Sequence, residues 1–479
     1  MNLCHTTLDR LPDTVIAPRH VPPVATGIVH FGPGAFHRAH QASYIDTVLD
    51  TDPRWAIAAV ALRSAGTVAA LAAQDGLYTL AIRDAASSLR VIAAHSCFIG
   101  PDGARQTHAL LADPAVRLVT STVTEKGYCL AVDGTLDLAH PDILHDLAGT
   151  DAPRSLVGWL VAGLAARRAA GHAPFVPMPC DNLAGNGAKL HAALVAFAAT
   201  RDAGLGDWIA GEVRVPATMV DSITPASDAA LLAQVASALG MADAAPVQRE
   251  SFTQWVIEDI GRPLGPDLAA AGAIVTPDVG GFERAKLRIL NGAHSTLAYA
   301  GLLRGRSSVA EAMADPELAA LVDRMIRDDI IPMLPPVAGL DLDAYRQSVL
   351  QRFANPVIVH RLDQIAQDGS QKMPYRLGDT LRDNRRAGRM PQGVIAALGG
   401  WIAFLIQRSR DGAPIIDPSA TALIAAASAG TPRAVIERLA GAELGLSRDL
   451  REDAAVLETL ERAVSAMLSG DVRGALAAT

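Results

Sequence analysis

Residues 27–34 read Gly-Ile-Val-His-Phe-Gly-Pro-Gly, a short apolar run that ends in two glycines separated by a proline. An Ala-rich helical pattern follows at once, so the segment predicts a buried strand, a tight turn and a helix. Gly32 and Gly34 match the first two glycines of the dinucleotide-binding fingerprint, but His37 stands at the third position. Such a turn lets a pyrophosphate approach the backbone N–H groups that open the helix. A tight turn without a ligand is the alternative interpretation at this point.

The rest of the chain separates into two patterns. Strand candidates and a helical stretch alternate in the first half, at residues 55–62, 67–73, 77–82 and 117–123. This alternation predicts an α/β domain with a parallel, doubly wound sheet. Beyond about residue 277, long helical patterns dominate, at 282–300, 308–333, 341–352 and 391–407. We therefore expect a dinucleotide-binding domain of the Rossmann type over residues 1–278 and a mainly helical domain over 279–479.

Composition narrows the class of protein. The 479 residues are 50% hydrophobic and 19% charged, with a net charge of −8 that is spread along the chain, which makes disorder and nucleic-acid binding poor interpretations. The four cysteines are far apart and indicate neither a disulfide framework nor a metal site: Cys4, Cys97, Cys129 and Cys180. No signal peptide is recognisable, and the uncharged stretch 390–407 reads as a core helix. We expect a cytoplasmic monomer or small homo-oligomer with no membrane partner.

Lysine is rare in this chain. Only four of the 42 basic residues are lysines, Lys126, Lys189, Lys286 and Lys372. Arginine can replace lysine on most solvated faces but not where an amine must lose its proton, so the four lysines are the first candidates for chemistry.

Lys286, Asn291 and His294 lie in a segment with helical periodicity, residues 283–300. At about 100° per residue their side chains stand at roughly 0°, 140° and 80°, on one broad face that extends about 12 Å along the axis. Hydride transfer at a secondary alcohol needs a base for the hydroxyl proton and donors for the developing oxyanion. A neutral lysine can be that base if burial lowers its pKa by about three units from ~10.4. The alternative is a set of solvated polar residues on an Ala-rich helix.

Two further segments bear on ligand binding. A polar loop at 181–187 follows a strand candidate at 173–178 and can supply another amide. After the second strand, where an acidic residue would select NAD, the sequence is Arg63-Ser64-Ala65-Gly66. No acid stands there, so NAD and NADP both stay open, and Arg63 can equally be a surface residue.

Several segments together resemble the polyol-specific long-chain dehydrogenase/reductase family, which includes mannitol 2-dehydrogenase and fructuronate reductase. They occur in the family's order, at residues 32–41, 122–129, 180–187, 219–225, 254–259, 286–294 and 368–372. The resemblance covers about residues 25–410. It implies a Rossmann-type domain, a mainly helical domain, an active site in the cleft between them and NAD(P)-dependent interconversion of a sugar alcohol and a ketose.

The resemblance also implies roles for single residues. Lys286 matches the catalytic base, and His294 matches the residue that positions the substrate and the lysine. The other matches are the alkoxide-stabilising Asn182 and Asn291, the proton-relaying Glu283, the substrate or cofactor contact Asp221 and the substrate-binding Lys372. Cofactor contacts are expected from Gly32, Gly34, Ala35, Phe36, Arg38 and Arg63, with His40 nearby. The sequence departs from the family where Ser222 replaces a common arginine and where Ala65 and Gly66 replace an acidic pair.

The substrate signals are mixed. Residues 125–127 and 360–376 resemble fructuronate reductase, whereas 181–183 and 62–64 resemble mannitol 2-dehydrogenase. A uronate carboxylate would need a cation, for which the candidates are Lys126, Arg361, Lys372 and Arg376. We favour D-mannitol and D-fructose, with D-mannonate and D-fructuronate as the alternative. D-arabinitol, D-sorbitol, a sugar phosphate and a non-catalytic nucleotide sensor are more remote, and a sensor would not need a titratable base.

Overall fold

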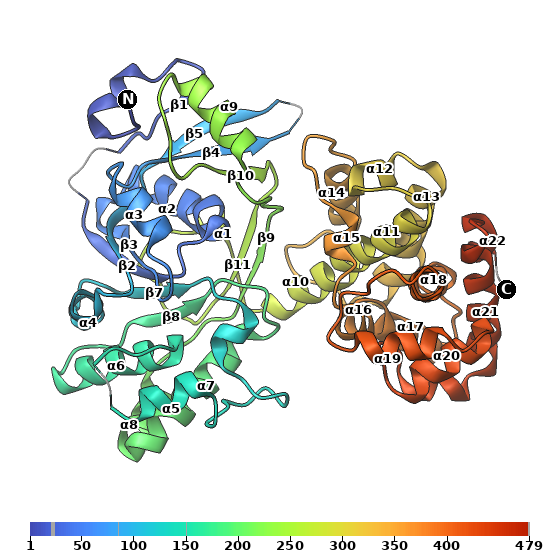
Figure 1. Cartoon of the computed structure of the whole chain (residues 1–479). Coiled ribbons are helices and arrows are strands. Elements are labelled where there is room, and N and C mark those ends of the chain that lie inside the picture. Colours follow the sequence, from blue (N-terminus) through green and yellow to red (C-terminus); the bar gives the residue numbers. More distant parts are fainter. Residues whose placement is uncertain (21–23, 85, 150, 478–479) are drawn as a thin grey trace. The chain divides into compact units, whose positions relative to one another are not determined.

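The computed structural model describes residues 1–20, 24–84, 86–149 and 151–477 (Figure 1). The chain divides into two compact units, Met1–Val279 and Gly280–Thr479. The sequence pattern changes at the same place, where strand candidates give way to long helical stretches.

The first unit is built around a five-stranded sheet. Its strands are β2 (Thr26–Phe31), β3 (Ala56–Val60), β6 (His95–Ile99), β7 (Leu118–Ser121) and β8 (Val176–Pro179). All neighbours pair in parallel, in the order β6-β3-β2-β7-β8. Starting from β2, the chain adds β3 and β6 on one side and then returns to add β7 and β8 on the other side. This is the doubly wound Rossmann arrangement that the sequence predicts, and such sheets bind ligands at the carboxyl ends of the strands flanking the reversal.

Helices cover both faces of this sheet, which explains why its strands are apolar throughout. Val29 and Phe31 of β2 belong to a core that also contains residues of α6 (Leu156–Ala169) and α7 (Asn186–Arg201). Ile28 points to the opposite core, with α2 (Gln41–Leu49). The remaining helices of this unit are α1 (Ala35–Ala39), α3 (Gly66–Ala72), α4 (Ala104–Ala112), α5 (Pro141–Leu147), α8 (Ala203–Glu212) and α9 (Ala229–Leu239).

The strand expected at 77–82 forms, but in a different sheet. β4 (Tyr78–Arg83) pairs antiparallel with β5 (Ser88–Ile92) and parallel with β10 (Val247–Glu250), in the order β1-β5-β4-β10 with β1 (Val15–Ile16). The third strand of the Rossmann sheet is instead β6, after this inserted hairpin. Apolar periodicity identifies a strand but not its neighbour, because pairing depends on contacts distant in sequence. A third sheet holds β9 (Thr218–Asp221), β11 (Gln254–Glu258) and β12 (Ile274–Thr276).

The second unit is helical in the part of it that the structure describes. α18 (Gln392–Arg410) runs through its core against α11 (Gly292–Leu303) and α21 (Ala454–Leu468), and its residues from Gly393 to Ile406 are buried. None of the helices described in the chain is long and apolar enough to cross a membrane. The other helices are α10 (Val279–Ala285), α12 (Val309–Met313), α13 (Pro316–Arg324), α14 (Leu342–Phe353), α15 (Leu362–Ile365), α16 (Gly369–Met373), α17 (Asp379–Arg386), α19 (Ala420–Ala427), α20 (Pro432–Gly441) and α22 (Val472–Leu476).

The helix expected at 282–300 is not a uniform α-helix. Between α10 and α11 lies a π-helical segment, Lys286–Asn291, and two more π-helical segments pack against it, Met325–Ile330 and Pro374–Gly378. Such wide turns are rare in proteins and occur frequently at functional sites.

Candidate functional site

The glycine turn follows β2, and its two glycines have different functions. Gly32 adopts a φ of +89°, and a Cβ there would lie 2.3 Å from the carbonyl oxygen of Thr122, so no other residue fits. Gly34 has an ordinary φ of −69° and precedes the first residue of α1. A Cβ on Gly34 would meet nothing nearer than the Gly32 carbonyl oxygen at 4.0 Å. Gly32 is therefore needed for the turn itself, whereas Gly34 leaves the space in front of the helix open.

A cavity of about 340 Å³ lies over this turn. It is lined by Gly32–Gly34, by residues 61–64 after β3 and by residues 122–124 after β7. It thus lies at the carboxyl ends of the strands that flank the reversal of the sheet, the binding position of doubly wound folds. A second cavity of about 250 Å³ shares Arg63, Asp142 and Arg154 with it. Together with the open approach at Gly34, these cavities fit a dinucleotide.

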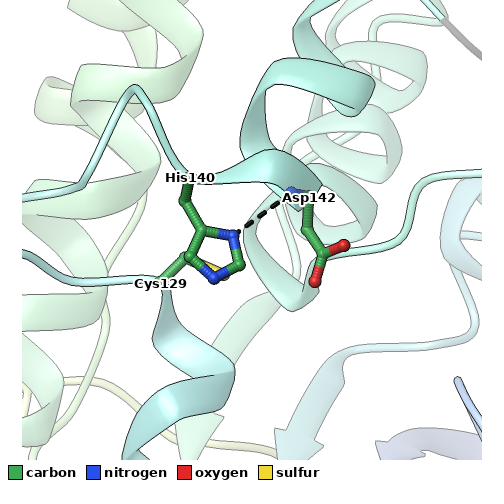
Figure 2. Close-up of side chains that lie close together, drawn as sticks. All are labelled: Cys129, His140 and Asp142. Atoms are coloured by element: carbon green, nitrogen blue, oxygen red, sulfur yellow. Dashed lines mark hydrogen bonds between the residues drawn. The ribbon is translucent and has the colours of Figure 1, made fainter.

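The structure brings together three residues that sequence spacing did not connect, Cys129, His140 and Asp142 (Figure 2). Their ligand atoms lie within 4.8 Å of one another, and Cys129 and Asp142 line the larger cavity. His140 Nδ1 accepts a hydrogen bond from the Asp142 backbone N–H at 3.2 Å, so in the neutral ring Nε2 carries the proton. Burial, reinforced by the charge of Asp142, raises the pKa of the Cys129 thiol to about 11.

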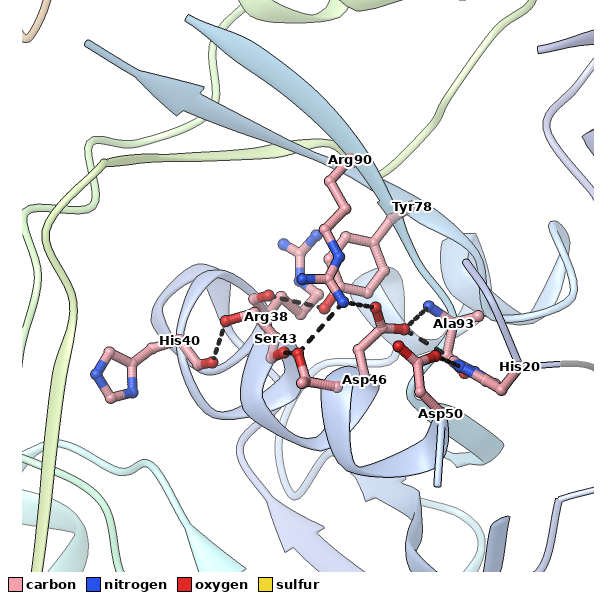
Figure 3. Close-up of polar contacts among 10 residues, drawn as sticks. His20, Arg38, His40, Ser43, Asp46, Asp50, Tyr78, Arg90 and Ala93 are labelled. Atoms are coloured by element: carbon pink, nitrogen blue, oxygen red, sulfur yellow. Dashed lines mark hydrogen bonds and ion pairs between the residues drawn. The ribbon is translucent and has the colours of Figure 1, made fainter. Parts of the chain in front are cut away.

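Arg38, which the sequence predicts to contact the cofactor, is held inside the first unit (Figure 3). Its Nη1 donates to the Ala245 carbonyl at 2.5 Å, and its own carbonyl accepts from the Tyr78 hydroxyl at 2.7 Å. The His40 ring pairs with the Gln254 carbonyl at 3.0 Å. Neither residue is among those that line the two cavities in the described chain. The polar end of Arg38 thus binds the backbone of the loop before β10, and that of His40 binds the backbone of β11.

The other expected cofactor residues lie in several elements of the first unit. Gly32, Gly34 and Arg63 line the larger cavity. Ala35 and Phe36 form the first two positions of α1, and Asp221 is the buried last residue of β9.

Histidines near the turn form a packed core group. The rings of His30 and His37 stack with centroids 3.4 Å apart, and His37 Nε2 lies 3.1 Å from His95 Nε2. Burial lowers the pKa of His30 and that of His95 to about 3. His30 and His95 are therefore neutral at physiological pH. His30 contacts the turn through the bond of its Nε2 with the Gly32 carbonyl at 3.2 Å, and its Nδ1 pairs with Thr120 of β7 at 2.7 Å.

In the second unit, the π-helical segment begins at Lys286 and ends at Asn291. Residues five apart lie closer together around the axis in a π-helix than in an α-helix, because the π-helix winds about 4.4 residues per turn, about 82° each. Lys286 and Asn291 are therefore separated by about 50° around the axis rather than the 140° of an α-helix. Three α-helical steps then return His294 to within about 10° of Lys286. The three side chains share a narrower face than the sequence predicts.

His294 is buried at the edge of this face. Its ring stacks on Phe353 with centroids 4.2 Å apart and meets the edge of His360 at 4.8 Å. Its Nε2 has no hydrogen-bond partner among the described residues. Burial first, and then the positive groups of His360, Arg376, Arg352 and Lys286, hold the pKa of His294 well below its usual value. A neutral imidazole with one unsatisfied nitrogen is suited to pair with a hydroxyl of a ligand.

Arg376 holds this face from a neighbouring π-helical segment. Its Nη1 donates to Ser295 Oγ at 2.9 Å and to the Asn291 carbonyl at 3.4 Å, and its buried Nε has no partner among the described residues. A Cβ on Gly292 would lie 3.2 Å from the Arg376 carbonyl oxygen, so the two segments are in close contact. Of the cations proposed to meet a carboxylate, Arg376 is the one beside His294.

The remaining expected residues are placed as follows. Glu283 lies in α10, three residues before Lys286. Lys372 in α16 donates to the Gln367 carbonyl at 2.7 Å, and Arg361 is exposed and pairs with Asp363. Lys126 lies in a short turn of the first unit, as does Asn182 after β8. Beside Asn182, burial raises the pKa of Asp181 to about 6, and the Tyr128 hydroxyl donates to that carboxylate.

Comparison with known proteins finds the same two parts. The mannitol dehydrogenase Rossmann domain model matches residues 26–265, and the mannitol dehydrogenase C-terminal domain model matches residues 278–468. D-mannonate oxidoreductase of Escherichia coli (strain K12) is 39% identical over 82% of each chain. Mannitol 2-dehydrogenase of Cereibacter sphaeroides is 39% identical over 83% of this chain and 85% of the relative. Pseudomonas fluorescens mannitol 2-dehydrogenase, solved with NAD and D-mannitol, is 34% identical with a TM-score of 0.84 over 100% of this chain and 99% of that one.

Proposed function

This chain belongs to the mannitol dehydrogenase family of oxidoreductases, which act on CH–OH groups with NAD, and we propose that it interconverts D-mannitol and D-fructose. The reaction is hydride transfer at the secondary alcohol of C2. The single observation that carries the proposal is the buried His294, whose Nε2 has no partner among the described residues and whose pKa is lowered in part by the charge of Lys286. Lys286 and Asn291 begin and end the π-helical segment that directly precedes the helix of His294. A base, an amide donor and a neutral imidazole are the groups that alcohol oxidation requires.

NAD fits the first unit, where Gly32, Gly34 and the opening of α1 would hold its pyrophosphate. When bound, it supplies the hydride acceptor. Lys286, as the neutral amine, accepts the proton of the substrate hydroxyl. Asn291 donates its amide N–H to the oxygen as negative charge develops. His294 pairs through Nε2 with a hydroxyl, which fixes the orientation of the carbon chain.

Three further roles rest on the family resemblance. Asn182 provides a second amide for the alkoxide, Glu283 passes the proton from Lys286 toward solvent, and Asp221 contacts the substrate or cofactor. Lys372, Lys126 and Arg361 remain candidates for binding the far end of the substrate.

A second candidate substrate pair is D-mannonate and D-fructuronate. The observation that favours it is Arg376, a buried guanidinium beside His294 whose Nε has no partner among the described residues. A uronate carboxylate would pair with that group. The E. coli relative at 39% identity is a D-mannonate oxidoreductase.

The test is a substrate panel that follows the near-ultraviolet absorbance of the reduced cofactor. Fructose, fructuronate and fructose 6-phosphate are each offered with NADH and with NADPH. We expect the highest kcat/KM with fructose. A higher kcat/KM with fructuronate would replace the first pair by the second. If the protein binds the cofactor but turns over none of the substrates, both substrate pairs are contradicted, and a non-catalytic nucleotide sensor is the remaining interpretation.

Location and assembly are proposals of the same standing. The four cysteines are free thiols in the structure, which supports a reducing compartment such as the cytoplasm. A monomer or small homo-oligomer is expected, and light scattering of the purified protein measures its mass.

A further inference from the structure

We propose that Asp142, together with Arg63, sets the preference between NAD and NADP; the inference rests on the function proposed above. Doubly wound domains that select NAD usually hold the ribose hydroxyls with an acid at the end of the second strand. Here that strand, β3, is followed by Leu62, Arg63 and Ser64, and none of these is an acid.

The structure supplies an acid from a distant part of the chain. Asp142, in the first turn of α5, lines both cavities together with Arg63, and the two side chains approach to 3.5 Å. The Asp142 carboxylate therefore borders the space at the end of β3, where the adenosine ribose of a dinucleotide lies in this fold. Its backbone is held by the bond to His140 and by the fixed φ of Pro141 (Figure 2). This carboxylate occupies the place that the sequence pattern left without an acid.

The exposure of the pair determines how it can act. The Arg63 side chain is 81% exposed and that of Asp142 is 24% exposed, so the ion pair is weak and opens at little cost. With NAD, the carboxylate accepts hydrogen bonds from the two ribose hydroxyls while Arg63 turns outward. With NADP, the 2′-phosphate brings a second negative charge beside Asp142, and Arg63 and Arg154 of the same cavity partly neutralise it. The expected result is a preference for NAD that still tolerates NADP.

The experiment measures KM for NADH and NADPH at saturating ketose, and the dissociation constant of each cofactor by titration. Asp142→Ala should raise the KM for NADH by roughly ten- to a hundredfold. Asp142→Asn keeps the shape but removes the charge, and should lower the KM for NADPH. Arg63→Ala should act in the opposite direction, raising the KM for NADPH by roughly tenfold and leaving that for NADH nearly unchanged. Asp207→Ala, an exposed acid of α8, is the matched control for the loss of one negative charge.

The outcomes separate this inference from the proposed function. The inference is overturned if the ratio of the KM for NADH to the KM for NADPH is the same in folded Asp142→Ala and Asp142→Asn as in the wild-type protein. An equal rise of both KM values would be one such result. If the wild-type protein reduces none of the offered substrates, the proposed function fails, but the dissociation constants still test Asp142.

Discussion

The glycine turn of the first unit and the π-helical segment of the second present functional groups in opposite ways. At Gly32–Gly34 the backbone is the functional surface, and side chains must be absent for a ligand to approach it. At Lys286–Asn291 the side chains are the proposed functional surface, and the wider π-helical backbone brings residues five apart closer together around the axis. A backbone site is visible in the sequence because glycine is its signature. A side-chain site shows its residues in the sequence but not their alignment.

The two regions also differ in what holds them. The turn is held by the backbone of two neighbouring strand ends, through the Gly32 N–H bond to the Val60 carbonyl at 3.0 Å and the close approach of Thr122 to Gly32. The π-helical segment depends on its neighbours, two further π-helical segments and the bonds of Arg376 to Ser295 and Asn291. Substitutions in the turn should therefore act on one ligand, whereas those around the π-helix should act on catalysis.

The largest effect is expected from Lys286→Ala. Turnover should fall by about 10²- to 10⁴-fold, the usual contribution of a positioned acid or base, while the dissociation constant for NADH stays within about twofold. Stopped-flow turnover and NADH titration measure the two quantities. Lys189→Ala, a lysine of α7 in the other unit, is the control and should keep full activity. Near-normal turnover of Lys286→Ala would remove Lys286 from the mechanism.

The paired substitutions Gly34→Ala and Gly32→Ala test the turn. Gly34→Ala should fold normally, because its φ of −69° suits any residue, but its methyl group fills the approach and should weaken NADH binding by roughly tenfold or more. Gly32→Ala should lower the melting temperature, because its φ of +89° and the Thr122 oxygen at 2.3 Å exclude a Cβ. Thermal melting and NADH titration distinguish the two. Wild-type NADH affinity in Gly34→Ala would mean that the cofactor does not pass over this turn.

Arg376→Gln should give a smaller effect, a several-fold fall in kcat together with a shift in its pH profile. Removing this positive charge raises the pKa of His294, so the imidazole is protonated at a higher pH. As the pH is lowered, the variant should therefore lose activity at a higher pH than the wild-type protein does. His360, Arg352 and Lys286 still face His294 and limit the shift. Arg376→Lys keeps the positive charge, so it should restore the wild-type pH dependence on the acid side without restoring kcat. The two variants thus distinguish the effect of the charge from the effect of the guanidinium geometry. Identical pH profiles in all three proteins would contradict an electrostatic role.

The smallest effect on activity is expected from Asp329→Asn, in the supporting π-helical segment Met325–Ile330. Burial raises the pKa of Asp329 to about 6, and its Oδ2 accepts from the Val394 N–H at 3.0 Å. The folded state thus binds a proton more tightly than the unfolded state, whose carboxyl titrates near 4, so stability falls as pH rises from about 4 to 6. At pH 7 the neutral variant should be more stable by roughly 1 to 3 kcal/mol, and near pH 4 the difference should vanish. Urea unfolding at pH 7 and at pH 4 measures the free energy of unfolding of both proteins. Equal stabilities at pH 7 would show that the charged carboxylate of Asp329 does not destabilise the folded state.

The fold was predictable where the pattern is local. The apolar run to Phe31, the glycines at 32 and 34 and the next apolar strand specify a strand-turn-helix unit, and the doubly wound sheet follows from its repetition. The hairpin at residues 78–92 was not predicted, because the pattern of apolar residues in a strand does not indicate which strand it pairs with. The partner of the Arg38 side chain could not be predicted for a similar reason, since Ala245 lies 207 residues away.

The candidates for the reacting groups can be read from the chain alone. Lys286 stands out because lysine is scarce, and Asn291 and His294 follow it at short spacing. Their alignment could not be read, since the π-helical turn arises from packing against segments 30 to 90 residues away in sequence. Asp142 beside Arg63, and Arg376 beside His294, depend on the same kind of long-range contact. Local sequence specifies which chemistry is present because backbone preference and residue type act over a few residues, and folding specifies which groups meet because burial and pairing act across the whole chain.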